Sequence, residues 1–386
     1  MGREELLLEV LPPLDWDRVG TETWGDVFRQ IRKIGTATFI RSLFKKDKIG
    51  KAFVWERVFK PIRQPEWWGG DALYHPPAYD EPVSELERKL KNGEFVITSE
   101  ISPPLGAGAG KLRHDIEMVK DFVTAINFTD NSSASPRMSS MACCKVAHDL
   151  GAGPVLQVAA RERTRSGLQA DIVGANEIGI RNVLCISGDS PMIGPTPFSQ
   201  MNILDIDSVQ MLWILRKMRD EGKYLDGREM KNRPRLFLGA AASPFASEPK
   251  FQAIREHKKI NAGAQFFETN LIFDADRLDL WLEQLYKRDI LNKVYILAGI
   301  TSLRSCKMAY YLHNRIPGVT LPDKILKRMD DAGDGAHEEG IQIALELIEA
   351  LKQKQGINGI HIMAVTEEGV VPRLVTEGGL GMFRDV

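Results

Sequence analysis

The chain has 386 residues and a formal net charge of −1, with 43% hydrophobic and 27% charged residues. This length accommodates one large domain plus an accessory segment, or two ordinary domains. The near-zero net charge argues against general polyanion binding by the whole molecule, so no nucleic-acid partner is expected.

The cysteine pattern and the hydropathy exclude further classes. The four cysteines form no C-x-x-C pair, which disfavours a zinc ribbon or a cysteine-ligated iron–sulfur cluster held by this chain alone, and no metal site is predicted. No stretch approaches the ~20 apolar residues of a membrane span. The first apolar run follows two glutamates and is broken by Pro12–Pro13, unlike a signal peptide. We therefore expect a cytoplasmic protein.

Residues 1–90 differ in composition from the rest of the chain. They hold five of the seven tryptophans, and twelve Lys/Arg against four Asp/Glu lie between Arg18 and Arg63. We interpret this stretch as an accessory segment, helical around Thr23–Ile34. Three roles remain open: covering one end of the main domain, docking a partner, or contacting a membrane surface.

Residues 91–386 alternate between strand-like runs and amphipathic helical stretches. The strand-like runs are Phe95–Thr98, Ala125–Phe128, Val155–Ala159, Asn182–Ile186, Leu236–Ala240, Phe266–Thr269, Val294–Ala298 and Gly359–Met363. Regular alternation of this kind predicts parallel strands joined by right-handed helical crossovers. Eight units predict a (β/α)₈ TIM barrel, with additional loop structure in the wider gaps before the fifth and eighth strands.

Polar residues gather where these strands end. Phe95–Thr98 is followed by Pro103–Pro104, which stop regular structure, so Glu100 is expected just past the end of a buried strand. Asp189 follows the fourth run in a Gly-Asp turn. Thr129 and Asp130 follow the second run, Gln157 lies in the third and Asn270 ends the sixth. Convergence of these groups on one rim predicts a ligand pocket, whereas His361 alone has the pattern of a core histidine.

The order of these features resembles the methylenetetrahydrofolate reductase family. The resemblance extends from Phe95 to Leu374 and rests on five ordered pieces: Thr98–Pro104, Asn127–Thr129, Ser187–Asp189, Lys259–Asn270, and Gly340–Ala344 with Gly356–His361. It implies a barrel that holds FAD at its C-terminal mouth and reduces 5,10-methylenetetrahydrofolate to 5-methyltetrahydrofolate, with hydride passing from the reduced FAD to the substrate iminium.

The resemblance also implies roles for single residues. Glu100 would be the general acid that opens the substrate ring, and Asp189 would lie beside the flavin and the pterin. Asn270 and Tyr310 would contact the pterin. The flavin-binding positions would be Thr129, Gln157, Ser187, Gly188, Asp189 and Lys259. Some contacts should differ from the family pattern, because Ser187 replaces a frequent arginine, Gln157 a frequent histidine and Asn270 a glutamine.

Electron supply and assembly stay open at this point. NADH, NADPH or an electron-transfer partner subunit would reduce the FAD, and a homo-oligomer is predicted. Two alternatives differ in function class: a barrel subunit that depends on a companion for the chemistry, and a folate-dependent methyltransferase barrel that would bind a pterin without a flavin.

Overall fold

The computed structural model describes residues 73–189, 205–316, 318–365 and 367–381. The chain divides into two compact units, Met1–Gly69 and Gly70–Val386. The first unit, with the helix predicted around Thr23–Ile34, lies outside the described residues. The accessory, docking and assembly roles considered for residues 1–90 therefore stay predictions.

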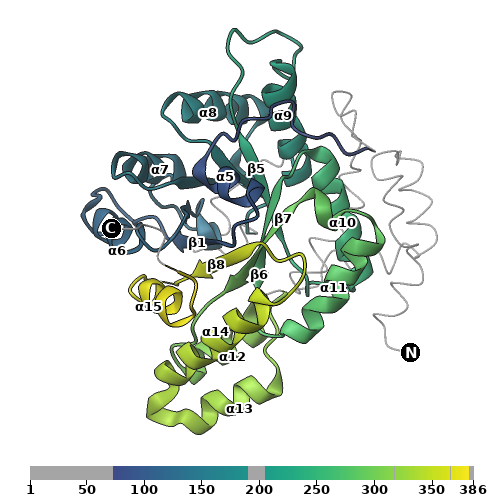
Figure 1. Cartoon of the computed structure of the whole chain (residues 1–386). Coiled ribbons are helices and arrows are strands. Elements are labelled where there is room, and N and C mark those ends of the chain that lie inside the picture. Colours follow the sequence, from purple (N-terminus) through teal and green to yellow (C-terminus); the bar gives the residue numbers. More distant parts are fainter. Residues whose placement is uncertain (1–72, 190–204, 317, 366, 382–386) are drawn as a thin grey trace, which may run out of the picture. The chain divides into compact units, whose positions relative to one another are not determined.

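Eight parallel strands close into a barrel in the order of the sequence, each paired with the next and β8 with β1 (Figure 1). The strands are β1 (Val96–Ile101), β2 (Ala125–Phe128), β3 (Pro154–Ala159), β4 (Asn182–Ile186), β5 (Phe237–Ala242), β6 (Phe266–Leu271), β7 (Tyr295–Ile300) and β8 (Gly359–Met363). The predicted (β/α)₈ barrel is confirmed.

One predicted strand end was wrong. Glu100 does not follow β1 but lies inside it, paired with Asn127 of β2 and Met363 of β8. The strand continues through Ser99 and Glu100 because both neighbouring strands supply ladder partners, and Pro103 lies beyond its end at Ile101. Glu100 is consequently held by a rigid ladder instead of a loop.

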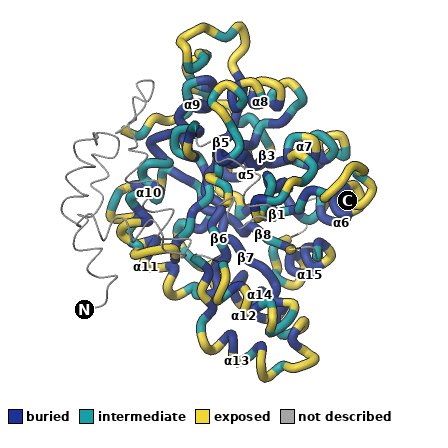
Figure 2. Tube along the Cα trace, turned by 180° about the vertical axis from the view of Figure 1, so that it is seen from behind, coloured by how far each residue is buried: buried dark blue, intermediate teal, exposed yellow. Residues whose placement is uncertain are grey.

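Helices surround the strands, and burial is concentrated in the strands and on the inner helix faces (Figure 2). The helices are α5 (Glu85–Lys91), α6 (Gly110–Val119), α7 (Ser140–Asp149), α8 (Arg165–Glu177), α9 (Ser208–Glu221), α10 (Pro249–Ala262), α11 (Ala275–Lys287), α12 (Cys306–Arg315), α13 (Asp323–Ala332), α14 (Ala336–Lys352) and α15 (Val370–Glu377). None of these described helices combines the length and apolarity needed to span a membrane.

Local chemistry fixes several helix ends. Asp207 and Gln210 form a reciprocal capping box at the start of α9, and Gly222 ends that helix in the left-handed conformation. The hydroxyls of Ser139 and Thr164 accept backbone N–H groups at the starts of α7 and α8. These caps fix the residue at which each helix begins. They therefore also fix where the preceding loop, which carries site residues, ends.

Helix α5 closes the end of the barrel where the strands begin. Leu86 and Leu90 pack in one buried cluster with the first inward residues of the strands, including Val96, Phe237 and Phe266. The rings of Phe237 and Phe266 stack with centroids 4.8 Å apart. The ligand-accessible end is therefore the opposite one, where the strands finish.

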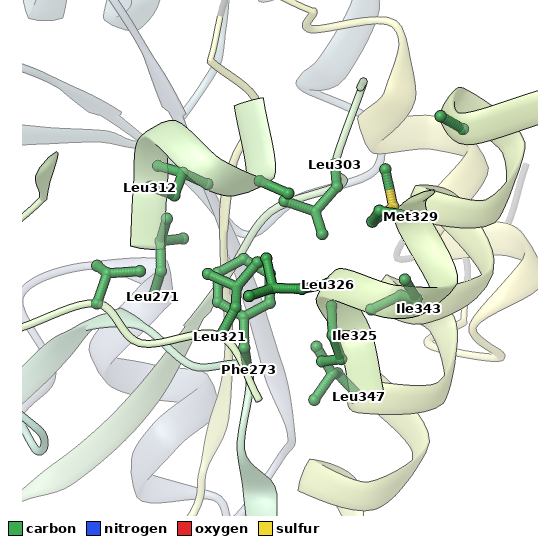
Figure 3. Close-up of a cluster of buried hydrophobic side chains, with 13 residues drawn as sticks. Leu271, Phe273, Leu303, Leu312, Leu321, Ile325, Leu326, Met329, Ile343 and Leu347 are labelled. Atoms are coloured by element: carbon green, nitrogen blue, oxygen red, sulfur yellow. The ribbon is translucent and has the colours of Figure 1, made fainter. Parts of the chain in front are cut away.

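A second apolar cluster fills the long connection between β7 and β8. It joins α12, α13 and α14 to the end of β6, with Leu271, Phe273, Leu303, Leu312 and Met329 among its members (Figure 3). The gap that the spacing predicts before the eighth strand thus contains three packed helices, of which α13 lies outside the simple strand–helix alternation.

Candidate active site

Glu100 stands at the mouth of the barrel, and 24% of its side chain is exposed. Gln157 Nε2 of β3 donates a hydrogen bond of 2.9 Å to Glu100 Oε2. Burial, together with the nearby Asp189 carboxylate, raises the pKa of Glu100, and the Gln157 hydrogen bond opposes that shift. A carboxyl with a raised pKa at a ligand-accessible mouth has the properties of a general acid.

A second carboxyl, Glu268 of β6, lies deeper in the barrel and is only 4% exposed. Asn127 Nδ2 of β2 donates to Glu268 Oε2 at 2.5 Å, while Glu268 Oε1 is buried without a hydrogen-bond partner. Burial and the Glu100 carboxyl raise the pKa of Glu268 to about 8, against the lowering effect of Asn127. Glu268 therefore favours its neutral form at neutral pH.

His361 of β8 lies between the two carboxyls. Its Nε2 is 4.0 Å from Glu100 Oε2 and 3.9 Å from Glu268 Oε2, and its Nδ1 is 2.9 Å from the hydroxyl of Thr98. Burial lowers the pKa of His361 to about 3, so the ring is neutral. The sequence interpretation of a partnered core histidine agrees with the Thr98 contact, and the ring also joins the two acids.

The loops after β2 and β4 are tied together at the mouth. Asp189 Oδ2 accepts the backbone N–H of Ser133 at 2.7 Å. Arg161, almost fully buried, donates to the backbone carbonyls of Asp189 and Asn131 at 2.7 and 3.0 Å. Asn131 and Ser133 have φ values of 49° and 55°, a strained conformation for residues with side chains. Asp189 and Arg161 together hold that conformation.

The remaining predicted residues lie on α10, on β6 and just after β2 and β4. Thr129 directly follows β2 and its buried hydroxyl has no hydrogen-bond partner. The Ser187 hydroxyl lies 3.1 Å from that of Ser208. Lys259 of α10 donates to the Ala241 carbonyl of β5 at 2.6 Å, and burial lowers its pKa. Asn270 lies in β6, where its Oδ1 accepts the N–H of Leu271 at 2.9 Å.

Tyr310 is placed apart from this group. It lies on α12, its side chain is exposed, and its hydroxyl donates to Asp330 of α13 at 2.7 Å. No contact found among the described residues joins it to Glu100 or Asp189. Its predicted pterin contact stays a prediction that would require a ligand reaching this outer helix pair.

The mouth is suited to a large polar group such as a flavin. The orphaned Thr129 hydroxyl is a buried hydrogen-bonding group that costs about 1–3 kcal/mol while unpaired. Gly188 has φ 81°, which glycine adopts without strain, and its lack of a side chain lets the backbone after β4 approach a ligand closely. Lys259 adds a cation on the β5 side. These residues fit an anionic cofactor bound across the strand ends.

The sequence analysis did not predict three residues of the site: Glu268, Asn127 and Arg161. Glu268 stands two positions before Asn270, and Asn127 two before Thr129, so each faces the barrel interior with a predicted site residue. That spacing was the available signal. Arg161 offered none, because it acts from a short 3₁₀ turn, η3 (Ala160–Glu162), whose partners come from other loops.

The fold and the site define a (β/α)₈-barrel protein with an acidic, ligand-accessible site at the carboxyl ends of its strands. The model of the family described as methylenetetrahydrofolate reductase matches residues 85–379. The chain therefore belongs to the methylenetetrahydrofolate reductase family.

Two known proteins illustrate the distance of this relationship. Methylenetetrahydrofolate reductase 1 of Schizosaccharomyces pombe is 23% identical over 220 residues, which cover 55% of this chain and 33% of that protein. The chain thus spans about a third of the length of this curated relative. A solved structure of a Clostridium thermocellum protein, described as binding two copies of 5-methyl-5,6,7,8-tetrahydrofolic acid, is 15% identical with a TM-score of 0.51 and covers 76% of this chain and 98% of its own. The latter likeness shows the shared fold.

Proposed function

We propose that this chain is a flavin-dependent reductase that converts 5,10-methylenetetrahydrofolate to 5-methyltetrahydrofolate. Family membership supports the reaction class. The ligand named for the Clostridium thermocellum protein supports a folate as the substrate class. In this proposal the cofactor is FAD, and NADH, NADPH or a partner protein provides its electrons.

The observation that carries the proposal is the position of Glu100. Its carboxyl is at once accessible from the mouth, held by Gln157 and raised in pKa by burial and by Asp189. Opening the substrate's five-membered ring requires a proton on a weakly basic nitrogen. A raised pKa favours the protonated form of Glu100, and that form can deliver a proton to the nitrogen.

Other residues would orient the ligands. FAD, when bound, supplies the hydride for the opened substrate. Thr129, Gly188 and Lys259 would hold it, since they offer an unpaired hydroxyl, a backbone free of side-chain bulk and a cation. Asp189 fixes the loop beside Glu100 through Ser133. Asn270 of β6 lies near the carboxyl end of its strand, where the pterin would bind.

The proposal is tested with Glu100→Gln, which keeps the shape of the side chain but has no proton to give. We expect flavin binding and flavin reduction by the donor to stay near wild-type rates. The folate half-reaction should slow by about 10²–10⁴-fold, the usual contribution of a positioned general acid. Stopped-flow absorbance measures the two half-reactions separately.

Glu94→Gln is the matched control. Glu94 precedes β1 at the opposite end of the barrel and is exposed, so both half-reactions should be unaffected. If Glu100→Gln reduces the folate at the wild-type rate, or if it fails only in flavin reduction, the assigned role of Glu100 is wrong.

A further inference from the structure

The barrel interior beneath Glu100 contains a second acid that the reaction described above does not use. Glu268 lies on the inner face of β6, and its side chain is 3% exposed. An ionised carboxylate has about four acceptor sites, yet Glu268 receives one hydrogen bond, from Asn127. Because the carboxyl is buried and receives only one hydrogen bond, its surroundings favour the neutral carboxylic acid.

Among the residues that the structure describes, the groups facing Glu268 provide no compensating cation at contact distance. Glu100 from β1 adds a negative charge, and His361 from β8 approaches within 3.9 Å as a neutral ring. The positions paired with Glu268, Ala241 of β5 and Leu297 of β7, are uncharged. Lys259 approaches β5 at Ala241, where its ammonium donates to the backbone carbonyl. Two carboxyls in such a site resist ionising together, and they titrate as a pair.

His361 connects the two acids by a single atom. Its Nδ1 is engaged with Thr98, which leaves Nε2 directed at both carboxyls, 3.9 Å from one and 4.0 Å from the other. These distances exceed a hydrogen bond, so a small carboxyl rotation must precede transfer. The relay uses the tautomer that carries its proton on Nδ1 and donates it to the Thr98 hydroxyl, which leaves Nε2 unprotonated. Nε2 can then accept a proton from Glu268 and pass the same proton to Glu100 without a change at Nδ1.

We propose that Glu268 is a proton store that recharges Glu100 from inside the barrel through His361, a role that rests on the proposed function of Glu100. The Glu268 carboxyl loses its proton, the Glu100 carboxylate gains it, and Glu100 then transfers it to the substrate nitrogen. Ligands that cover the mouth would separate Glu100 from solvent. A proton donor inside the barrel would then supply Glu100 with the proton that each turnover consumes. Solvent restores the proton on Glu268 after product leaves.

The first test uses the protein without added folate. Carbon-13 NMR of glutamate-labelled protein should show a carboxyl carbon, that of Glu268, which titrates near pH 8. This signal should be absent in Glu268→Gln. It should persist in Glu256→Gln, the matched control, which removes another fully buried glutamate that lies on α10 outside this group.

The second test is the pH profile of the folate half-reaction. We expect wild-type and Glu268→Gln rates to coincide at low pH, where Glu100 holds its own proton. As the pH rises toward 8 the variant should lose about tenfold per pH unit, while the wild type keeps its rate until the store is ionised. Flavin reduction by the donor should be equal in both, which a general structural defect would not produce.

Two results overturn the proposal: a Glu268 carbon that titrates near the ordinary ~4.3, or coincident pH profiles for the two proteins. If Glu268→Gln does not fold, the NMR titration of the wild-type protein is sufficient to test the proposal. Normal folate reduction by Glu100→Gln would instead refute the proposed function and leave the NMR result standing, so the two failures are distinguishable.

Discussion

Gly188, which has no Cβ atom, shapes the loop that carries Asp189. At Gly188, with φ 81°, an added Cβ would lie 3.1 Å from the Cβ of Ala159 and 3.2 Å from that of Arg161. The same arginine holds the carbonyls of Asp189 and Asn131. Bulk at residue 188 would therefore disturb both loops of the mouth.

We expect Gly188→Ala to destabilise the protein by about 1–2 kcal/mol, the cost of a left-handed conformation for a residue with a side chain, and to weaken flavin retention. Thermal unfolding and bound-flavin absorbance measure the two effects. Gly174→Ala is the matched control: Gly174 lies within α8, and its Cβ would meet nothing within 4 Å, so that change should be neutral or stabilising. Equal melting temperatures for the two variants would contradict the argument.

At the same scale, the sequence allowed most of the mouth to be predicted, because a polar residue at the end of an apolar run is conspicuous. Glu100 and Asp189 were predicted in this way, Gln157 was predicted from within an apolar run, and the structure brings Glu100 into a hydrogen bond with Gln157. Glu268 was overlooked because a buried acid inside a strand is unfavourable by every propensity rule. Its partner Asn127 lies 141 residues away, and only the closed barrel brings the two together.

At the scale of elements, the strand cores were predicted correctly and several strand ends were not. Apolar runs located all eight strands, and β2, β4 and β8 have the predicted bounds. β1 extends further than predicted, into Ser-Glu-Ile, because ladder pairing with neighbouring strands outweighs the weak β-propensity of polar residues. β6 extends to Leu271, which pairs with Gly299 of β7 after a register shift that follows Glu268. In the β7–β8 connection, periodicity predicted the helix at Gly340–Gln355, which corresponds to α14, whereas α12 and α13 were not predicted and pack in a cluster assembled from several elements.

The segment before α5 is an element of the barrel, although it has no regular structure. The Tyr79 hydroxyl lies 3.0 Å from Glu87 Oε1, and Val83 N–H donates to Glu87 Oε2 at 2.8 Å. Ser84 Oγ donates to Asn182 Oδ1 at 2.6 Å and also caps α5. Since Glu87 is fully buried, these contacts satisfy a carboxylate that would otherwise be costly.

We therefore expect truncation at two points to give different results. Removing residues 1–69 should leave a folded barrel, because that cut falls between the two compact units. Removing residues 1–84 should cost at least about 1–3 kcal/mol more, since Glu87 then loses hydrogen bonds in a buried position. Circular dichroism and urea unfolding of both proteins provide the measurement. Equal unfolding midpoints would show that residues 70–84 contribute nothing to the barrel.

At the scale of the whole molecule, the buried ionisable groups determine how stability varies with pH. The pKa of Glu268, about 8 when folded, exceeds its ordinary value of ~4.3, so its stabilising contribution is complete below ~4.3 and is lost as the pH rises through 8. The pKa of His361 is about 3 when folded against an ordinary ~6.5. Its contribution is complete above ~6.5 and is lost as the pH falls toward 3. Of the two contributions, those of Glu268 and His361, only that of Glu268 changes between pH ~6.5 and pH 8.

That window allows a direct measurement on the intact protein. We expect the free energy of unfolding of the wild type, minus that of Glu268→Gln, to fall by roughly 1.4 kcal/mol per pH unit as the pH rises from ~6.5 to 8, because the unfolded wild type releases a proton that the folded barrel keeps. Urea unfolding of both proteins at several pH values gives this difference, in which the titrating groups that do not interact with Glu268 cancel. A difference that stays constant across the window would mean that Glu268 is already ionised in the folded barrel at neutral pH.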